Sequence, residues 1–184
     1  MTAYVILFRG VGGATQLPVK PLKAALEAAG FSQVATYINS GNAVLCSDLP
    51  CEEVVSRVAA SCAETFGFGK AVFALTAAEW AGLIARNPFP DAADVGKLLH
   101  AAVLANEPEP VKAEALEALA EAGGDRFTVV GRVAYLHTPR GFSQSKLAEK
   151  FDKAIGVPNT ARNWNTVLKL RQLVERAGEE QTGR

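Results

Sequence analysis

The succession of strand and helix patterns in this chain starts twice, and this repetition limits the folds open to it. The first pass begins with the β-branched and aromatic run at 3–8 and continues with helical spacing of apolar residues at 18–29. A hairpin follows around N-S-G-N at 39–42, then a helix at about 51–66 and a strand at 71–75. This βαββαβ order is the split βαβ, or ferredoxin-like, arrangement.

The second pass starts after the proline-rich break N-P-F-P-D, which is typical of a linker. It reads as a strand at 97–105, a helix at 111–122, a hairpin around Gly131 and Arg132, and a helix at 146–155. Where a final strand is due, T-A-R-N-W-N-T-V-L-K-L at 160–170 has the spacing of a helix. The sequence therefore predicts an α+β fold of two ferredoxin-like halves in tandem, residues 1–88 and 95–184, the second ending in an extra C-terminal helix.

Composition places the chain among soluble globular proteins. Of its 184 residues, 49% are hydrophobic and 21% are charged, close to the average for such proteins. No apolar run approaches the roughly 20 residues that a membrane span requires. The first residues lack the basic start and long apolar centre of a signal peptide. We therefore expect a cytoplasmic protein with no membrane contact.

The formal net charge is zero, but charge is unevenly distributed along the chain. Residues 1–125 contain 8 Lys/Arg and 14 Asp/Glu, whereas residues 126–176 contain 10 Lys/Arg and 3 Asp/Glu. Such asymmetry indicates that the basic segment either faces an anionic partner or docks on an acidic part of its own chain.

The chain has few residues suited to metal binding or nucleophilic catalysis. Three cysteines without C-x-x-C spacing and two histidines are a poor set of ligands, so we predict free thiols, no metal site and no cofactor. His137 could act as a general base, but no nucleophile or carboxylate motif is paired with it, and a structural role is favoured. His100 lies in an apolar strand and is expected to be structural too.

Three polar segments are candidates for a ligand site. If 160–170 begins a helix capped by Thr160, then Arg162, Asn163 and Asn165 lie beside its exposed amides and suit a phosphate or carboxylate. Alternatively, Trp164 anchors the helix in the core and its polar neighbours bind backbone groups. R-G-V-G-G-A-T-Q at 9–16 joins a strand to a helix but matches neither common phosphate-binding motif, so it is either a phosphate cradle or a mobile loop.

The hairpin turn at 39–42 carries enough polar groups to line a pocket, although hairpins use these residue types without any function. Taken together, the segments predict ligand-binding residues that would line one positively charged hollow: Arg9, Gly12, Gly13, Asn39, Ser40, Asn42, Arg162, Asn163 and Asn165.

These segments also resemble a known family. The chain is similar to a bacterial family catalogued as domain of unknown function 1697 in three segments: F-R-G-V-G-G, A-A-G-F-S-Q-V-A-T-Y-I-N-S-G-N-A-V and T-A-R-N-W-N-T-V-L-K-L. The resemblance implies two ferredoxin-like halves and brings no established activity. In the family the first loop reads nearer R-G-I-N-V-G-G-K-N, so here it is shorter and lacks that loop's asparagines and lysine.

The sequence leaves three functions open. The first is a small binding protein for an anionic ligand, held in a cleft near the start of the C-terminal helix. The ligand is either a nucleotide-like metabolite or, with weaker support, nucleic acid, because no aromatic signature of an RNA-binding sheet is present. The second is a metal-independent enzyme acting on a phosphorylated or carboxylated small molecule. The third is a structural or homo-oligomerising protein.

Overall fold

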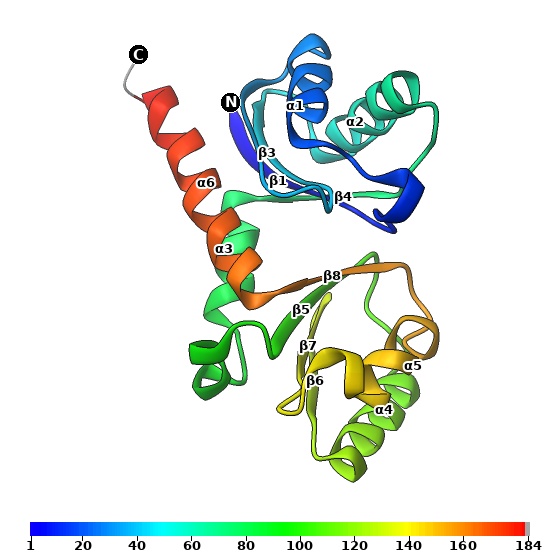
Figure 1. Ribbon diagram of the computed structural model, residues 1–184. Coiled ribbons are helices and arrows are strands. Elements are labelled where there is room, and N and C mark those ends of the chain that lie inside the picture. The colour runs from blue at the N-terminus through cyan, green and yellow to red at the C-terminus, as the bar shows by residue number, and fades with distance from the viewer. Residues whose placement is uncertain (183–184) are drawn as a thin grey trace. The chain divides into compact units, whose positions relative to one another are not determined.

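The structure is a computed structural model that describes residues 1–182, in which two four-stranded antiparallel sheets carry helices on their faces (Figure 1). It confirms the α+β class. The chain divides into two compact units: Met1–Gly82 together with the chain from Lys169 onward, and Leu83–Leu168. The divisions fall within two helices, α3 (Ala77–Ala85) and α6 (Trp164–Thr182).

The first sheet has the strand order β2-β3-β1-β4. Its strands are β1 (Thr2–Phe8), β2 (Ser32–Thr36), β3 (Asn42–Ser47) and β4 (Val72–Thr76), and every pairing between them is antiparallel. Helices α1 (Val19–Ala28) and α2 (Cys51–Phe66) pack on one face of this sheet (Figure 1). Because side chains alternate along a strand, Tyr4, Ile6 and Phe8 all enter the core beneath these helices.

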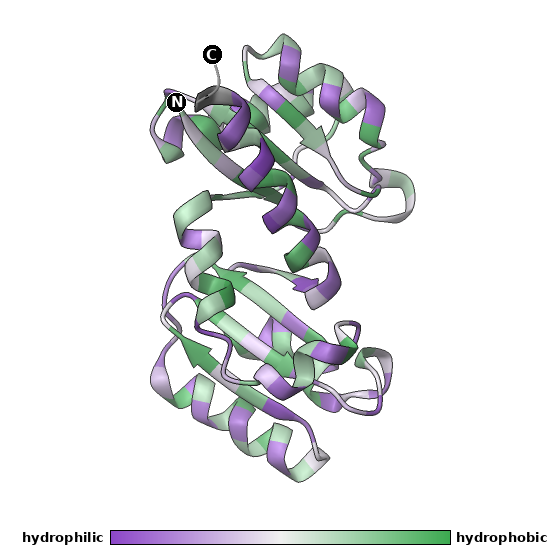
Figure 2. Ribbon diagram, turned by 90° about the vertical axis from the view of Figure 1, so that its left-hand side faces the viewer, coloured by the Kyte–Doolittle hydropathy of each residue, from purple (hydrophilic) through white to green (hydrophobic). Residues whose placement is uncertain are grey.

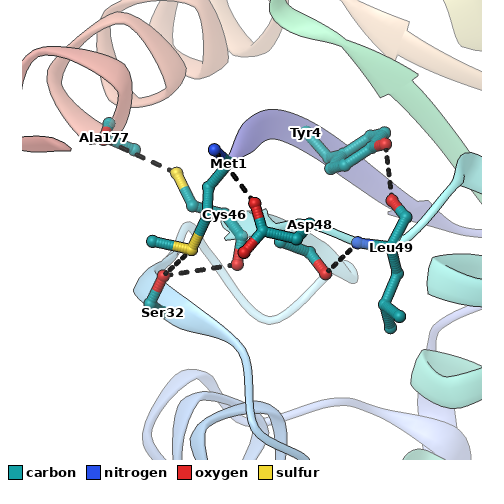
Figure 3. A network of polar contacts seen from close by, with 8 residues as sticks. Met1, Tyr4, Ser32, Cys46, Asp48, Leu49 and Ala177 are labelled. Carbon is teal, nitrogen blue, oxygen red and sulfur yellow. Dashed lines mark hydrogen bonds and ion pairs between the residues drawn. The ribbon is translucent and has the colours of Figure 1, made fainter. Parts of the chain in front are cut away.

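The C-terminal part of α6 belongs to this first unit. The thiol of Cys46, on β3, donates to the carbonyl oxygen of Ala177 at 3.5 Å (Figure 3). Val174 is buried on the same helix. Nearby, the N-terminal amino group pairs with Asp48 at 3.0 Å, which ties the start of β1 to the end of β3. The predicted limits of 1–88 and 95–184 assign the whole C-terminal helix to the second half, whereas these contacts group its last turns with the first.

The second sheet has the order β6-β7-β5-β8 and only antiparallel pairs. Its strands are β5 (Leu99–Leu104), β6 (Arg126–Val130), β7 (Val133–His137) and β8 (Asn159–Asn163). Helices α4 (Pro110–Gly123) and α5 (Lys146–Ala154) pack against each other and enclose the core with the sheet. Figure 2 shows hydrophilic and hydrophobic residues alternating along the helices, as one-sided burial requires.

Short 3-10 turns complete the two units. They are η1 (Gly13–Thr15) after β1, η2 (Pro90–Val95) before β5 and η3 (Phe142–Gln144) before α5. The loops that contain η1 and η3 carry the two candidate sites described below.

The start of the C-terminal helix was predicted wrongly. Residues 159–163 form β8, which pairs with β5 from Leu104 opposite Asn159 to His100 opposite Asn163. Thr160 is therefore a strand residue, and the helix begins four residues later, at Trp164. Helical spacing of apolar residues could not reveal this strand, because its hydrogen-bond partner lies more than fifty residues earlier in the chain.

Two further predictions concern cysteines and membranes. The three cysteines, Cys46, Cys51 and Cys62, are free thiols as predicted. Within the described part of the chain, the helices all lack either the length or the apolar composition needed to cross a membrane.

Candidate anion-binding loops

The glycine-rich loop after β1 is exposed and held by only a few hydrogen bonds. Gly10 and Gly13 have φ of 67° and 53°, in the left-handed region that glycine adopts without strain. The Thr15 hydroxyl donates to the carbonyl oxygen of Gly12 at 3.1 Å, and this contact closes the η1 turn. A Cβ placed on Gly12 or Gly13 would meet nothing within 4 Å, so one side of the loop faces open space.

Backbone donors of this loop have no acceptor within residues 1–182. The amides of Gly10, Val11, Gly12 and Gly13 make no hydrogen bond to any described group, whereas the Arg9 amide donates to Ala71 at 2.9 Å. A run of free amides on glycine-rich backbone resembles the concave donor sets that bind anions in other proteins.

Basic residues lie close to the loop in the structure or in the sequence. Lys70 lies in the loop between α2 and β4, and its Nζ donates to the carbonyl oxygen of Gly10. Arg9 and Lys20 flank the glycine loop in sequence, and the first carboxylate in the chain is that of Glu27. Because β1, β3 and β4 are antiparallel neighbours, the loop at 9–16, the turn at 37–42 and Lys70 lie at the same end of the sheet.

The two asparagine side chains of the hairpin turn form hydrogen bonds with neighbouring parts of the first unit. Asn42 is 0% exposed, and its Nδ2 donates to the carbonyl oxygen of Tyr37 at 3.1 Å and to Ser40 Oγ at 2.9 Å. Asn39 Oδ1 accepts from the Val19 amide at 3.3 Å, which satisfies a free donor at the start of α1. Both asparagines thus serve the architecture, and Asn42 presents no amide hydrogen outward.

Two residues of this turn have φ in the left-handed region. Gly41 has φ 73°, and a Cβ there would lie 2.7 Å from Phe8 Cβ and 2.8 Å from Val11 Cγ2. Ile38, at φ 48°, is 47% exposed, an uncommon conformation for a β-branched residue. The turn therefore packs closely against β1 and the glycine loop, with no room for a side chain at Gly41.

The remaining predicted site residues lie in the second unit. Arg162 is on β8, where its Nη1 donates to Thr160 Oγ1 and to the carbonyl oxygen of Ala161, each at 2.8 Å. Burial lowers the pKa of Arg162 to about 10. Asn163 caps α6, since its Oδ1 accepts from the Thr166 amide at 3.0 Å.

Trp164 is a core residue, as the alternative interpretation of this segment supposed. It is 2% exposed, and its ring centroid lies 6.5 Å from that of Tyr135. Asn165 is exposed and approaches Gly96, where a Cβ would lie 2.2 Å from its Oδ1. The structure thus gathers six of the predicted residues in the first unit and three in the second, and a single hollow lined by all nine stays a prediction.

Sequence reasoning missed Lys70 and Thr15, which complete the glycine loop. The signal for Lys70 was weak, because G-F-G-K at 67–70 resembles an ordinary turn and approaches Gly10 only through strand pairing. His137 has a structural hydrogen bond, in which its Nδ1 accepts from Arg126 Nε at 3.1 Å. Among the described residues, no group of three or more His, Cys, Asp or Glu side chains could hold a metal ion.

Comparison with known proteins gives two findings. A family model described as "Protein of unknown function (DUF1697)" matches residues 1–135. The solved structure of the conserved bacterial protein SP0830 from Streptococcus pneumoniae is similar, with a TM-score of 0.62 and 19% sequence identity over 94% of this chain and 98% of that one. At this identity the likeness concerns the fold alone. No match to a curated protein was found.

Proposed function

The chain belongs to the DUF1697 family of proteins of unknown function, and we propose that it binds a small anionic ligand on the glycine loop at 9–16. The observation that carries this proposal is the set of backbone amides from Gly10 to Gly13 that donate to no group in the described chain. Lys70 adds a positive charge beside them, and the segment contains no carboxylate. Free amides and a lysine together suit a phosphate or carboxylate.

A small molecule fits this site better than a nucleic acid. Sheets that bind single strands present exposed aromatic side chains on an open face. On β1 and β3, Val5, Leu7 and Val44, which alternate with the side chains under α1 and α2, are apolar and fully buried. The glycine loop is instead a local donor set, sized for one anionic group such as that of a nucleotide-like metabolite.

The test is equilibrium binding of inorganic phosphate and AMP, measured by calorimetry on the full chain. Gly12 has φ 164° and ψ 168°, an extended conformation open to any residue, so Gly12→Asp should fold while placing a carboxylate among the amides. Asn106→Asp, an exposed change of the same charge in the second unit, is the matched control. We expect Gly12→Asp to weaken phosphate binding at least tenfold and the control to leave it unchanged.

Two results would contradict the proposal. One is equal phosphate affinity of Gly12→Asp and the unmodified chain, and the other is the absence of binding by the unmodified chain. If a ligand that binds is also consumed, the metal-independent enzyme is supported instead. If only an oligonucleotide binds, with an affinity that falls steeply as salt rises, the nucleic-acid alternative is supported.

We also infer that each sheet with its two packed helices is a ferredoxin-like unit and that the two stand in tandem. Both units have the element order βαββαβ and corresponding strand orders, β2-β3-β1-β4 and β6-β7-β5-β8. β8 is the final strand of the second unit, which the sequence did not predict. An experimental structure in which the two sheets fail to superpose strand for strand would overturn this inference.

A further inference from the structure

His100 is a polar residue in a position that favours an apolar one. It lies on β5, on the same sheet face as Ala102 and Leu104, which belong to the core beneath α4 and α5. Its Nδ1 is buried and has no hydrogen-bond partner within the described residues. An unpaired buried polar atom costs free energy that an apolar side chain would avoid, so packing alone does not account for an imidazole here.

An exposed aromatic ring covers this imidazole. The ring centroids of His100 and Phe142 are 4.1 Å apart, with 34° between the planes. Phe142 is 36% exposed and is the one aromatic among the exposed large hydrophobic residues of the described chain. The second unit therefore presents a tilted pair of rings in close contact, of which the Phe142 ring is partly open to solvent.

The backbone holds Phe142 in this position. Gly141 has φ 105° and ψ 143°, a conformation that glycine tolerates and other residues avoid. The Gly141 amide donates to the carbonyl oxygen of Thr138 at 2.9 Å. A few residues later, Ser145 is the N-cap of α5. Thr138 is itself anchored to Leu98, next to β5, by its amide at 2.9 Å.

Basic side chains flank Phe142 in sequence and line a cavity of the second unit. Arg140 precedes Phe142 by two residues, and Lys146 opens α5; both are exposed. They line a cavity of about 500 Å³ together with Gln144 and Asp125. Asp125 is buried and its carboxylate accepts from Ser145 Oγ at 2.7 Å, so the exposed charges of this cavity are positive.

We propose that Phe142, backed by His100, is a stacking platform for a nucleobase whose attached phosphate contacts Arg140 and Lys146. A nucleobase stacks on an aromatic ring through its face, and Arg and Lys neutralise the phosphate that it carries. Desolvation lowers the pKa of His100 to about 4, so the imidazole beneath the platform is neutral near pH 7. The site lies wholly in the second unit and does not depend on the glycine loop.

The test compares AMP with adenosine, measured by calorimetry in the Gly12→Asp background to remove the glycine-loop site. Phe142→Leu keeps an apolar side chain but removes the ring, and we expect it to weaken AMP and adenosine binding roughly 5- to 150-fold. Arg140→Gln should weaken AMP binding but spare adenosine. Val111→Ala, an exposed apolar change on α4, is the matched control and should alter neither.

A second measurement places the base directly. Bound AMP should shift the NMR signals of the Phe142 ring and the His100 imidazole through ring currents. The proposal is overturned if Phe142→Leu binds AMP as tightly as its parent, or if these signals do not shift. It is also overturned if the parent binds neither AMP nor a ten-residue oligodeoxyadenylate.

The two sources of this ligand are separated by the same oligonucleotide. If the natural ligand is a free nucleotide, the affinity for AMP should match or exceed the affinity per site for the oligodeoxyadenylate. If the natural ligand is a single strand, the oligonucleotide should bind much more tightly than AMP. That binding should be lost in Phe142→Leu and should weaken as salt rises. An oligonucleotide that binds equally well to both variants would contradict the stacking role.

Discussion

Gly41→Ala tests how tightly the hairpin turn is wedged against β1. The added methyl group would lie 2.7 Å from Phe8 Cβ and 2.8 Å from Val11 Cγ2, closer than carbon atoms approach without displacement. At φ 73°, alanine also pays about 1–2 kcal/mol for the left-handed conformation. Overpacking typically adds about 1–3 kcal/mol, so the free energy of unfolding should fall by about 2–5 kcal/mol.

The assay is thermal and urea unfolding followed by far-UV circular dichroism. For a chain of this length, a loss of that size lowers the melting temperature by roughly 4–20 °C. Gly12→Ala is the control, because its Cβ meets nothing within 4 Å and its backbone is extended. It should change stability by less than about 1 kcal/mol. If Gly41→Ala unfolds within about 0.5 kcal/mol of the unmodified chain, the turn is free to move and the wedge does not exist.

Three further predictions concern the helix cap, the buried histidine and the thiols. Asn163→Ala should cost about 0.5–2 kcal/mol in urea unfolding, whereas Asn163→Asp should retain the cap; equal losses would exclude capping through Oδ1. Because the pKa of His100 falls from 6.5 to about 4 on folding, the folded chain binds fewer protons and loses stability as pH falls from 6.5 towards 4; His100→Leu should flatten this decline, and an unchanged pH profile would refute it. At pH 8 iodoacetamide should modify half-buried Cys51 before Cys46 and Cys62, since both are buried and burial raises the pKa of Cys62 to about 11; peptide mapping that finds Cys62 modified first would contradict this.

The functional residues were only partly visible in the sequence. The glycine loop and the N-S-G-N turn stand out as local patterns, and the structure places both at one end of the first sheet. Their roles differ in a way that no pattern reveals. Asn42 binds Tyr37 and Ser40 within its own turn, while the loop amides from Gly10 to Gly13 donate to no group of the described residues. The apolar strand around His100 favours a structural role, and only its contact with Phe142, forty-two residues later, makes it a candidate.

Local sequence sufficed for elements whose signals lie within a few residues. The helix at 51–66 follows from its own apolar spacing, and the hairpins at 39–42 and 131–132 follow from turn residues that supply positive φ. Tertiary structure alone decided β8, because a strand is completed by hydrogen bonds to a distant partner, here β5. It also decided which polar groups remain available to a ligand, since that depends on neighbours brought together by folding rather than on residue type.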